Sequence, residues 1–220
     1  MALACLSMLL LLQILWLGSA GDIHGGTILA MRGKDSVLVA SDSRFSSYKT
    51  GSFMLGEYPR PLFQVGSRTL VCCIGLDSDA HALNEAVKEQ LSNHEDTAAI
   101  EPESVARVVS NILYRNRLYL TPMVVGINSS GVPIICSMDG LGAQTLSEAF
   151  AVTGTASGGL YAICESEFRP DLCEEELLTT AERALTLALQ RDVLSGRRVY
   201  MTLLRSDGTR LRKTFSTDDA

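Results

Sequence analysis

The chain has 220 residues, of which 46% are hydrophobic and 20% charged, a composition typical of a globular protein and not of a disordered or fibrous one. Its formal net charge of -6 argues against a nucleic-acid-binding or anionic-membrane-binding surface, because both need an excess of Lys and Arg. Six cysteines without a CxxC pair and only three histidines argue against a disulfide scaffold, a zinc site or redox chemistry. We therefore expect no metal and no cofactor.

The first 20 residues differ from the rest of the chain because they contain no charged residue. Their apolar run at residues 9–17 is too short to span a bilayer comfortably, which takes about 20 residues. Small residues at Gly18 and Ala20 suit a signal-peptidase site before Gly21, but the basic start of a secretory signal is missing. A secretory signal, a propeptide and an extension that the working protein lacks all stay open. We treat residues 21–220 as a single domain.

The chain after this segment begins with predicted strands. Two apolar runs flank a polar turn at residues 32–35, which is typical of a hairpin, and the second run leads to Asp42. Ser, Tyr, Gly and Pro are frequent in residues 43–60, so an irregular excursion is expected there. The predicted strands of this part are residues 27–31, 36–41, 62–65 and 69–74.

Two helices follow, predicted from apolar residues at helical spacing. Asp77, Ser78 or Asp79 can cap the first helix, which ends near Leu91, and Pro102 suits the first turn of the second. The remaining predicted elements are strands at residues 123–127, 132–136 and 148–152, a small-residue loop at 154–159, helices at 160–166 and 174–190, and strands at 198–204 and 209–214. Strands and helices in such segregated groups favour a layered α+β fold over a doubly wound parallel sheet.

Four separated segments, in this order along the chain, carry a resemblance to a known family. They are GGTILAMRGKDSVLVASDSR, CCIGLDSDA, GTASGGLYA and RDVLSG, within residues 25–214. With these segments the chain resembles the β-type subunits of the proteasome. The resemblance implies an N-terminal nucleophile hydrolase fold: a four-layer αββα sandwich of two antiparallel sheets between helix layers. It also implies that an N-terminal threonine can serve as nucleophile in active members.

In active members, the threonine has its own α-amino group as base, a lysine assists it, and an aspartate orients the lysine. The resemblance places the supporting acidic and hydroxyl groups on Asp42, Asp192 and Ser195. Counting back from Asp42 without a gap, however, places the nucleophile on Gly26, with Thr27 one position later. Glycine has no hydroxyl, so we expect no catalytic residue, and the three matching residues are then vestigial.

The lysine is missing from its expected position as well. The only lysine between the hairpin and the strand at residues 69–74 is Lys49, whereas the counted positions fall on Tyr58 or Pro61. Arg60 lies near both, but its guanidinium stays protonated and cannot exchange a proton as lysine does. These two deficits predict a chain without peptidase activity of its own.

Asp42 and Asp192 also have a structural interpretation. Asp42 can bond nearby backbone amides where its strand ends, and Asp192 can close a helix against Arg191 or Arg197. Thr155 stands where active members have serine. Within the family, the chain looks most like one type of non-catalytic subunit, and the segments that carry this likeness are residues 25–26, 136–139, 154–155 and 164–166.

The resemblance implies a structural subunit of the 20S core in the cytoplasm and nucleus. Its expected partners are other β subunits in a seven-membered ring, the opposed β ring and the α ring, with no nucleic acid and no membrane. Asp139 is expected to line a neighbour's specificity pocket, although a turn aspartate before Gly140 is the alternative. Two other functions stay open: an active peptidase that uses Thr27, and a secreted protein of this fold with a glycan on Asn128.

Overall fold

The structure is a computed structural model that describes residues 23–24, 26–47, 53–57, 59–60, 62–92 and 100–218. The apolar segment of residues 1–20, with its open interpretations, lies outside the described residues. Within the described part of the chain, no helix is both long enough and apolar enough to cross a membrane.

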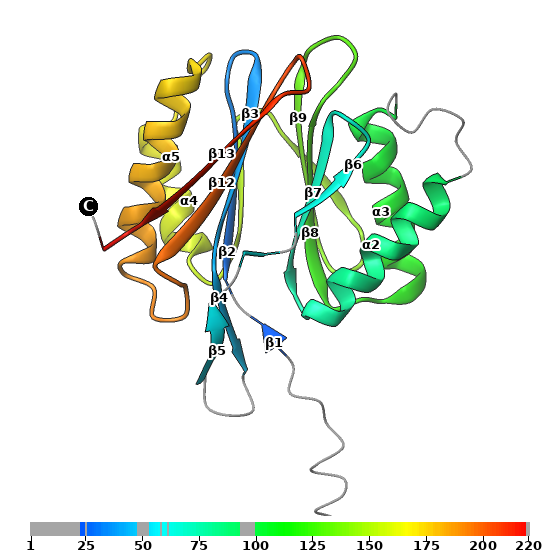
Figure 1. Ribbon diagram of the computed structural model, residues 1–220, viewed down its shortest axis with the longest axis horizontal. Coiled ribbons are helices and arrows are strands. Elements are labelled where there is room, and N and C mark those ends of the chain that lie inside the picture. Colours follow the sequence, from blue (N-terminus) through cyan, green and yellow to red (C-terminus); the bar gives the residue numbers. More distant parts are fainter. Residues whose placement is uncertain are drawn as a thin grey trace, which may run out of the picture.

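The predicted N-terminal hairpin forms the middle of a five-stranded antiparallel sheet (Figure 1) with the order β11-β2-β3-β12-β13. In β2, Ile28 and Ala30 pack toward the second sheet, whereas Leu29 and Met31 pack toward the helices. Successive side chains of a strand point to opposite faces, so both faces of this sheet are covered. Its strands are β2 (Thr27–Arg32), β3 (Ser36–Asp42), β11 (Phe150–Gly154), β12 (Arg198–Arg205) and β13 (Arg210–Ser216).

A second antiparallel sheet has the order β10-β9-β8-β7-β6 and packs face to face with the first. Apolar side chains from both inner faces form the core between the sheets, as in other β-sandwiches. The strands of the second sheet are β6 (Leu62–Val65), β7 (Thr69–Gly75), β8 (Leu120–Ile127), β9 (Pro133–Met138) and β10 (Gln144–Ser147).

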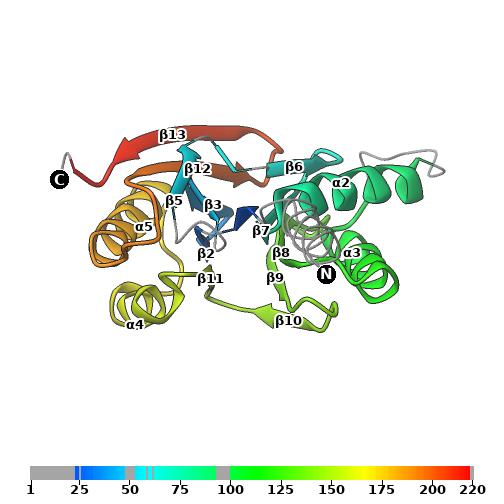
Figure 2. The same cartoon turned by 90° about the horizontal axis from the view of Figure 1, so that it is seen from below.

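Helices cover the two outer faces, so that the fold is the expected four-layer αββα sandwich. Seen from below in Figure 2, α4 and α5 lie outside the first sheet, and α2 and α3 lie outside the second. Each helix buries one apolar face, as the spacing of its apolar residues predicts. The helices are α2 (Asp77–Leu91), α3 (Pro102–Asn116), α4 (Ser157–Glu167) and α5 (Glu174–Leu189).

The segment of residues 43–60, which the sequence predicts to be irregular, contains two strands, and this prediction was wrong. Together with β1 they form a small antiparallel sheet with the order β1-β4-β5, which extends from one end of the first sheet in Figure 1. A register irregularity between Phe45 and Ser46 interrupts the alternation by which a strand is recognised in a sequence. The three strands are β1 (Ile23–His24), β4 (Arg44–Ser47) and β5 (Phe53–Glu57).

Three other differences from the predicted elements concern exposed or glycine-rich segments. The sequence does not predict β10, because this edge strand is polar and largely exposed and lacks an apolar pattern. The strand predicted from residue 148 begins at Phe150. The helix predicted from residue 160 begins at Ser157, because Gly158 and Gly159 in its first turn have low helix propensity and hide its start.

Candidate functional site

The candidate site lies at the end of the first sheet where β3 meets the loop after α5. Asp42 is fully buried there, and its carboxylate accepts bonds from four donors. Oδ1 accepts from the backbone N–H of Thr27 at 2.8 Å and from Arg60 Nε at 3.1 Å. Oδ2 accepts from the backbone N–H of Gly196 at 2.6 Å and of Arg44 at 3.3 Å. Asp42 therefore binds three parts of the chain that are distant in sequence, at Thr27, Arg60 and Gly196.

Arg60 is the cation that pairs with Asp42, and both side chains are almost inaccessible to solvent. The guanidinium lies 4.4 Å from the centre of the Phe45 ring, in a cation–π arrangement, and its Nη2 also donates to the backbone carbonyl of Arg44. A buried charge is tolerated only when it is paired and hydrogen-bonded in this way. The arginine thus takes part in the site, although no proton can be exchanged through it.

Gly26 lies directly beside this guanidinium. Its φ of +91° is a backbone conformation that residues with a side chain rarely adopt. A Cβ atom built on Gly26 would lie 1.6 Å from Nη2 of Arg60 and 2.0 Å from Cζ, far inside van der Waals contact. Position 26 therefore has no room for a side chain while Arg60 is bound to Asp42.

Thr27 is buried, and its hydroxyl is part of a chain of hydrogen bonds. Oγ1 accepts from the backbone N–H of Ala156 at 3.0 Å and lies 2.9 Å from Oγ of Ser195. Ser195 gives its own proton to Oδ2 of Asp192 at 2.6 Å, so Thr27 is the donor in the bond between the two hydroxyls. The chain runs from Ala156 through Thr27 and Ser195 to the carboxylate.

Asp192 accepts hydrogen bonds from its own loop after α5 and from the residue that follows β11. It accepts from the hydroxyls of Thr155 and Ser195, each at 2.6 Å, and from the backbone N–H of Leu194 at 3.0 Å. Partial burial opposes ionisation of this carboxyl, but the bonds from Ser195 and Thr155 outweigh it and lower the pKa below its ordinary value. The expected partners Arg191 and Arg197 were wrong, because hydroxyls of the site take their place.

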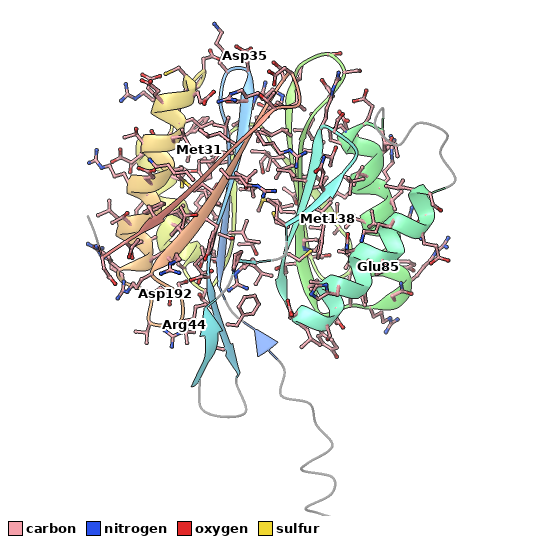
Figure 3. All side chains as sticks on the ribbon, viewed as in Figure 1. Met31, Asp35, Arg44, Glu85, Met138 and Asp192 are labelled. Atoms are coloured by element: carbon pink, nitrogen blue, oxygen red, sulfur yellow. The ribbon has the colours of Figure 1, made fainter. Side chains whose placement is uncertain are left out.

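The structure thus brings together Asp42, Asp192, Ser195, Gly26 and Thr27, the five positions that the resemblance singles out. Figure 3 labels Asp192 near Arg44 at this end of the first sheet, with Asp35 of the hairpin turn at the other end. Two partners were not anticipated: the ion pair of Arg60 with Asp42 and the bond of Thr155 with Asp192. Lys49, Tyr58 and Pro61 lie outside the described residues.

Asp139 lies apart from this cluster, in the turn between β9 and β10. Its Oδ1 accepts from the backbone N–H groups of Leu141 and Ala143, both at 2.9 Å, so it is a turn aspartate. The bonds from Ala143 and Leu141 lower the pKa of this exposed carboxyl. Oδ2 makes none of these bonds, and Asp139 therefore presents a negative charge at the surface.

In the part of the chain that the structure describes, no group of three or more His, Cys, Asp or Glu side chains is placed to hold a metal ion. The site consists of two connected parts. In one, the Asp42 carboxylate pairs with the Arg60 guanidinium, and in the other, the Asp192 carboxylate accepts from the hydroxyls of Thr155 and Ser195. Its groups hold each other in place through hydrogen bonds.

Comparison with known proteins agrees with this arrangement. Residues 23–204 match a family model described as "Proteasome subunit". The chain is 36% identical over 192 residues to proteasome subunit beta type-3 of Saccharomyces cerevisiae, which covers 84% of the chain and 92% of the yeast protein. It is 33% identical over 180 residues to the probable proteasome subunit beta type-3 of Schizosaccharomyces pombe, over 80% of the chain and 87% of that protein.

A plant relative is similar to the same degree. Proteasome subunit beta type-3-A of Arabidopsis thaliana is 33% identical over 180 residues, which are 80% of the chain and 87% of the plant protein. Beta type-3 is the type of subunit that the segments at residues 25–26, 136–139, 154–155 and 164–166 indicate, so the resemblance stated from the sequence is confirmed. Family model, relatives and four-layer fold agree: this chain belongs to the proteasome subunit family.

Proposed function

We propose that the chain is a non-catalytic structural β subunit of the 20S proteasome core, which serves ubiquitin-dependent and other intracellular protein degradation. The observation that carries this proposal is the position of the Arg60 guanidinium beside Gly26. A nucleophile needs a side chain at position 26, and the guanidinium fills the space that such a side chain would occupy. Asp42, Asp192 and Ser195 then act as structural residues.

The alternative in which Thr27 is the nucleophile fits the geometry less well. A catalytic N-terminal threonine needs a free α-amino group as its base. The nitrogen of Thr27 donates to Asp42, and its hydroxyl already accepts from Ala156 and donates to Ser195. An attack on a substrate carbonyl would require these bonds to break, and the cation at hand is Arg60, not lysine.

The proposed partners follow from the family. The chain would assemble with other proteasome β subunits in a seven-membered ring, against the opposed β ring and the α ring, without nucleic acid or membrane. We place it in the cytoplasm and nucleus. The five described cysteines are free thiols, which agrees with a reducing compartment. Oδ1 of Asn128 accepts from the backbone N–H groups of Ser130 and Val132 in its own turn, and we expect no glycan on Nδ2 in this compartment.

We expect no peptidase activity from this subunit. In purified assembled particles, an epoxyketone inhibitor that reacts with N-terminal threonines will label the active subunits, which serve as internal controls, and leave this chain unlabelled. N-terminal peptide mapping of the same particles will find no chain that begins at Thr27. A labelled Thr27, or a mature terminus at Thr27, would establish the active alternative and reject the structural role.

A second expectation concerns Asp139, which we propose to line the specificity pocket of an adjacent active subunit. Its exposed charge would favour basic substrate side chains. Asp139→Asn removes the charge but keeps an oxygen that can accept the turn bonds from Leu141 and Ala143. Assembled particles with this variant should cleave after basic residues several-fold more slowly, in line with a partly exposed ion pair of about 1 kcal/mol.

The matched control for this experiment is Asp207→Asn. Asp207 is also a turn aspartate, and it accepts from the backbone N–H of Thr209 at 2.8 Å between β12 and β13. The Asp207→Asn variant is expected to leave all cleavage activities of the particle unchanged. The pocket role would be excluded if cleavage after basic residues stayed at the wild-type rate in Asp139→Asn particles, or if cleavage after acidic and apolar residues fell equally.

A further inference from the structure

A cavity of about 300 Å³ opens between the two sheets, and Arg60 of the candidate site is part of its wall. It lies on the side of the sandwich where the edge strands β6 and β13 run, opposite β10 and β11 in Figure 2. Its lining comes from the inner face of the first sheet and from the chain that leads into and pairs with β6. The polar and charged residues among its described lining are Ser41, Arg60, Tyr200, Thr202, Arg212, Lys213 and Thr214.

The floor of the cavity consists of two rows of side chains that cross three strands. One row is formed by Val39, Thr202 and Arg212, which are paired in register across β3, β12 and β13. The next row on the same face is formed by Ser41, Tyr200 and Thr214. Register partners on one face of a sheet lie within contact distance of each other. The polar groups of these rows therefore converge.

Arg212 points into the cavity because of the alternation of β13. The ammonium group of Lys213 pairs with Glu182 of α5, on the outer face of the sheet. Its neighbours Arg212 and Thr214 must then face inward, toward the second sheet. Arg60 also lines the cavity, but its charge is already balanced by Asp42. Among the described lining residues there is no Asp or Glu to balance Arg212.

This composition is unusual for its place in the fold. Inner faces of packed sheets are normally apolar, and here the apolar core between the sheets gives way to hydroxyls and a guanidinium beyond Val39, Leu62 and Cys72. Tyr200 is half-buried, whereas Arg212 and Thr214 are exposed to solvent. Among the described residues, the Arg212 guanidinium and the Tyr200 hydroxyl have no hydrogen-bond partner within the protein, so both are open to a ligand. The volume is at the lower end of the range for small-molecule sites.

We propose that this cavity binds a small anion with a phosphate or carboxylate group. Arg212 supplies the counter-charge, and its planar guanidinium can bond two oxygens of either group at once. The hydroxyls of Tyr200, Thr202 and Thr214 donate to the same oxygens. Leu62 and Cys72 on the opposite wall contact any apolar part of the ligand. The cavity shares Arg60 with the Asp42 pair, but the proposed ligand contacts of Arg212 and Tyr200 do not depend on whether the subunit is catalytic.

Inorganic phosphate is the first probe of this site. The full-length chain is titrated with phosphate against chloride at equal ionic strength, and the unfolding midpoint reports binding, because a ligand of the native state raises it. Arg212→Gln should weaken the apparent affinity by about tenfold or more, as expected for loss of a hydrogen bond to a charged group. Tyr200→Phe should weaken it by a smaller factor, because it removes one neutral donor.

Arg210→Gln is the matched control. Arg210 lies on the same strand and the same face as Arg212, but it pairs with Leu204 and does not line the cavity. This variant should respond to phosphate as the wild type does. Electron density for phosphate beside Arg212 in assembled particles would support the proposal. It is overturned if phosphate does not raise the midpoint, or if Arg212→Gln and Arg210→Gln respond equally.

Discussion

Replacing Gly26 with alanine will lower the free energy of unfolding of the chain by roughly 3 kcal/mol or more. The new Cβ would collide with the guanidinium of Arg60, at 1.6 Å from Nη2, and must expel it. Asp42 would then keep a buried carboxylate without its counter-ion. The φ of +91° adds strain of about 1 to 2 kcal/mol for a residue with a side chain. Denaturant unfolding of the full-length variant measures the loss.

Gly158→Ala is the control for this substitution. Gly158 lies in the first turn of α4, and a Cβ there would meet no atom within 4 Å. Alanine should be neutral or stabilise the chain by up to about 1 kcal/mol, because alanine has a higher helix propensity than glycine.

The double variant Arg60→Ala and Gly26→Ala should destabilise the chain by less than the sum of the two single changes. Additive effects would show that the two positions do not compete for the same space.

Asp42→Asn should destabilise the chain by about 3 to 5 kcal/mol, because it leaves the Arg60 charge buried and unpaired. Both carboxylate oxygens accept from two donors each, which include the backbone N–H groups of Thr27 and Gly196. An amide has one oxygen, so in either orientation its NH2 group faces two donors. The unfolding midpoint in denaturant and the fraction of chain incorporated into particles both report this loss.

Asp35→Asn provides the reference for a carboxylate without partners of this kind. Asp35 is exposed in the hairpin turn, far from the site in Figure 3. Its loss should change the free energy of unfolding by no more than about 0.5 kcal/mol. A similar small effect for Asp42→Asn would mean that the Asp42 and Arg60 pair contributes little to the fold, and the structural role of Asp42 would be rejected.

Much of this architecture was accessible from local sequence patterns. The hairpin that ends at Asp42 follows from two apolar runs around a polar turn. The helices α2 and α5 follow from the helical spacing of their apolar residues. The strands β4, β5 and β10 were missed, since none of them has a clear apolar alternation in the sequence. Their pairing depends on main-chain hydrogen bonds, which leave no pattern in the order of the side chains.

The candidate site, too, was predicted from the sequence only in part. Asp42, Asp192 and Ser195 could be found because they stand in short segments with fixed spacing. The pairing of Arg60 with Asp42 joins residues 18 positions apart through a segment whose path the sequence did not predict. The partner of Asp192 was wrong for a related reason. Thr155 is 37 positions away, and its contact exists only because β11 pairs with β2 at the N-terminal end of that strand.

The neighbouring positions of Gly26 and Arg60 limit how this chain can change by single substitutions. A threonine at position 26 is excluded while arginine stands at position 60, and a smaller residue at position 60 leaves Asp42 unpaired while glycine stands at position 26. Each single change lowers stability, and a threonine at position 26 needs further changes that both remove the guanidinium and supply another cation for Asp42. The present pair is therefore a local optimum in sequence, separated from a threonine-bearing site by less stable intermediates.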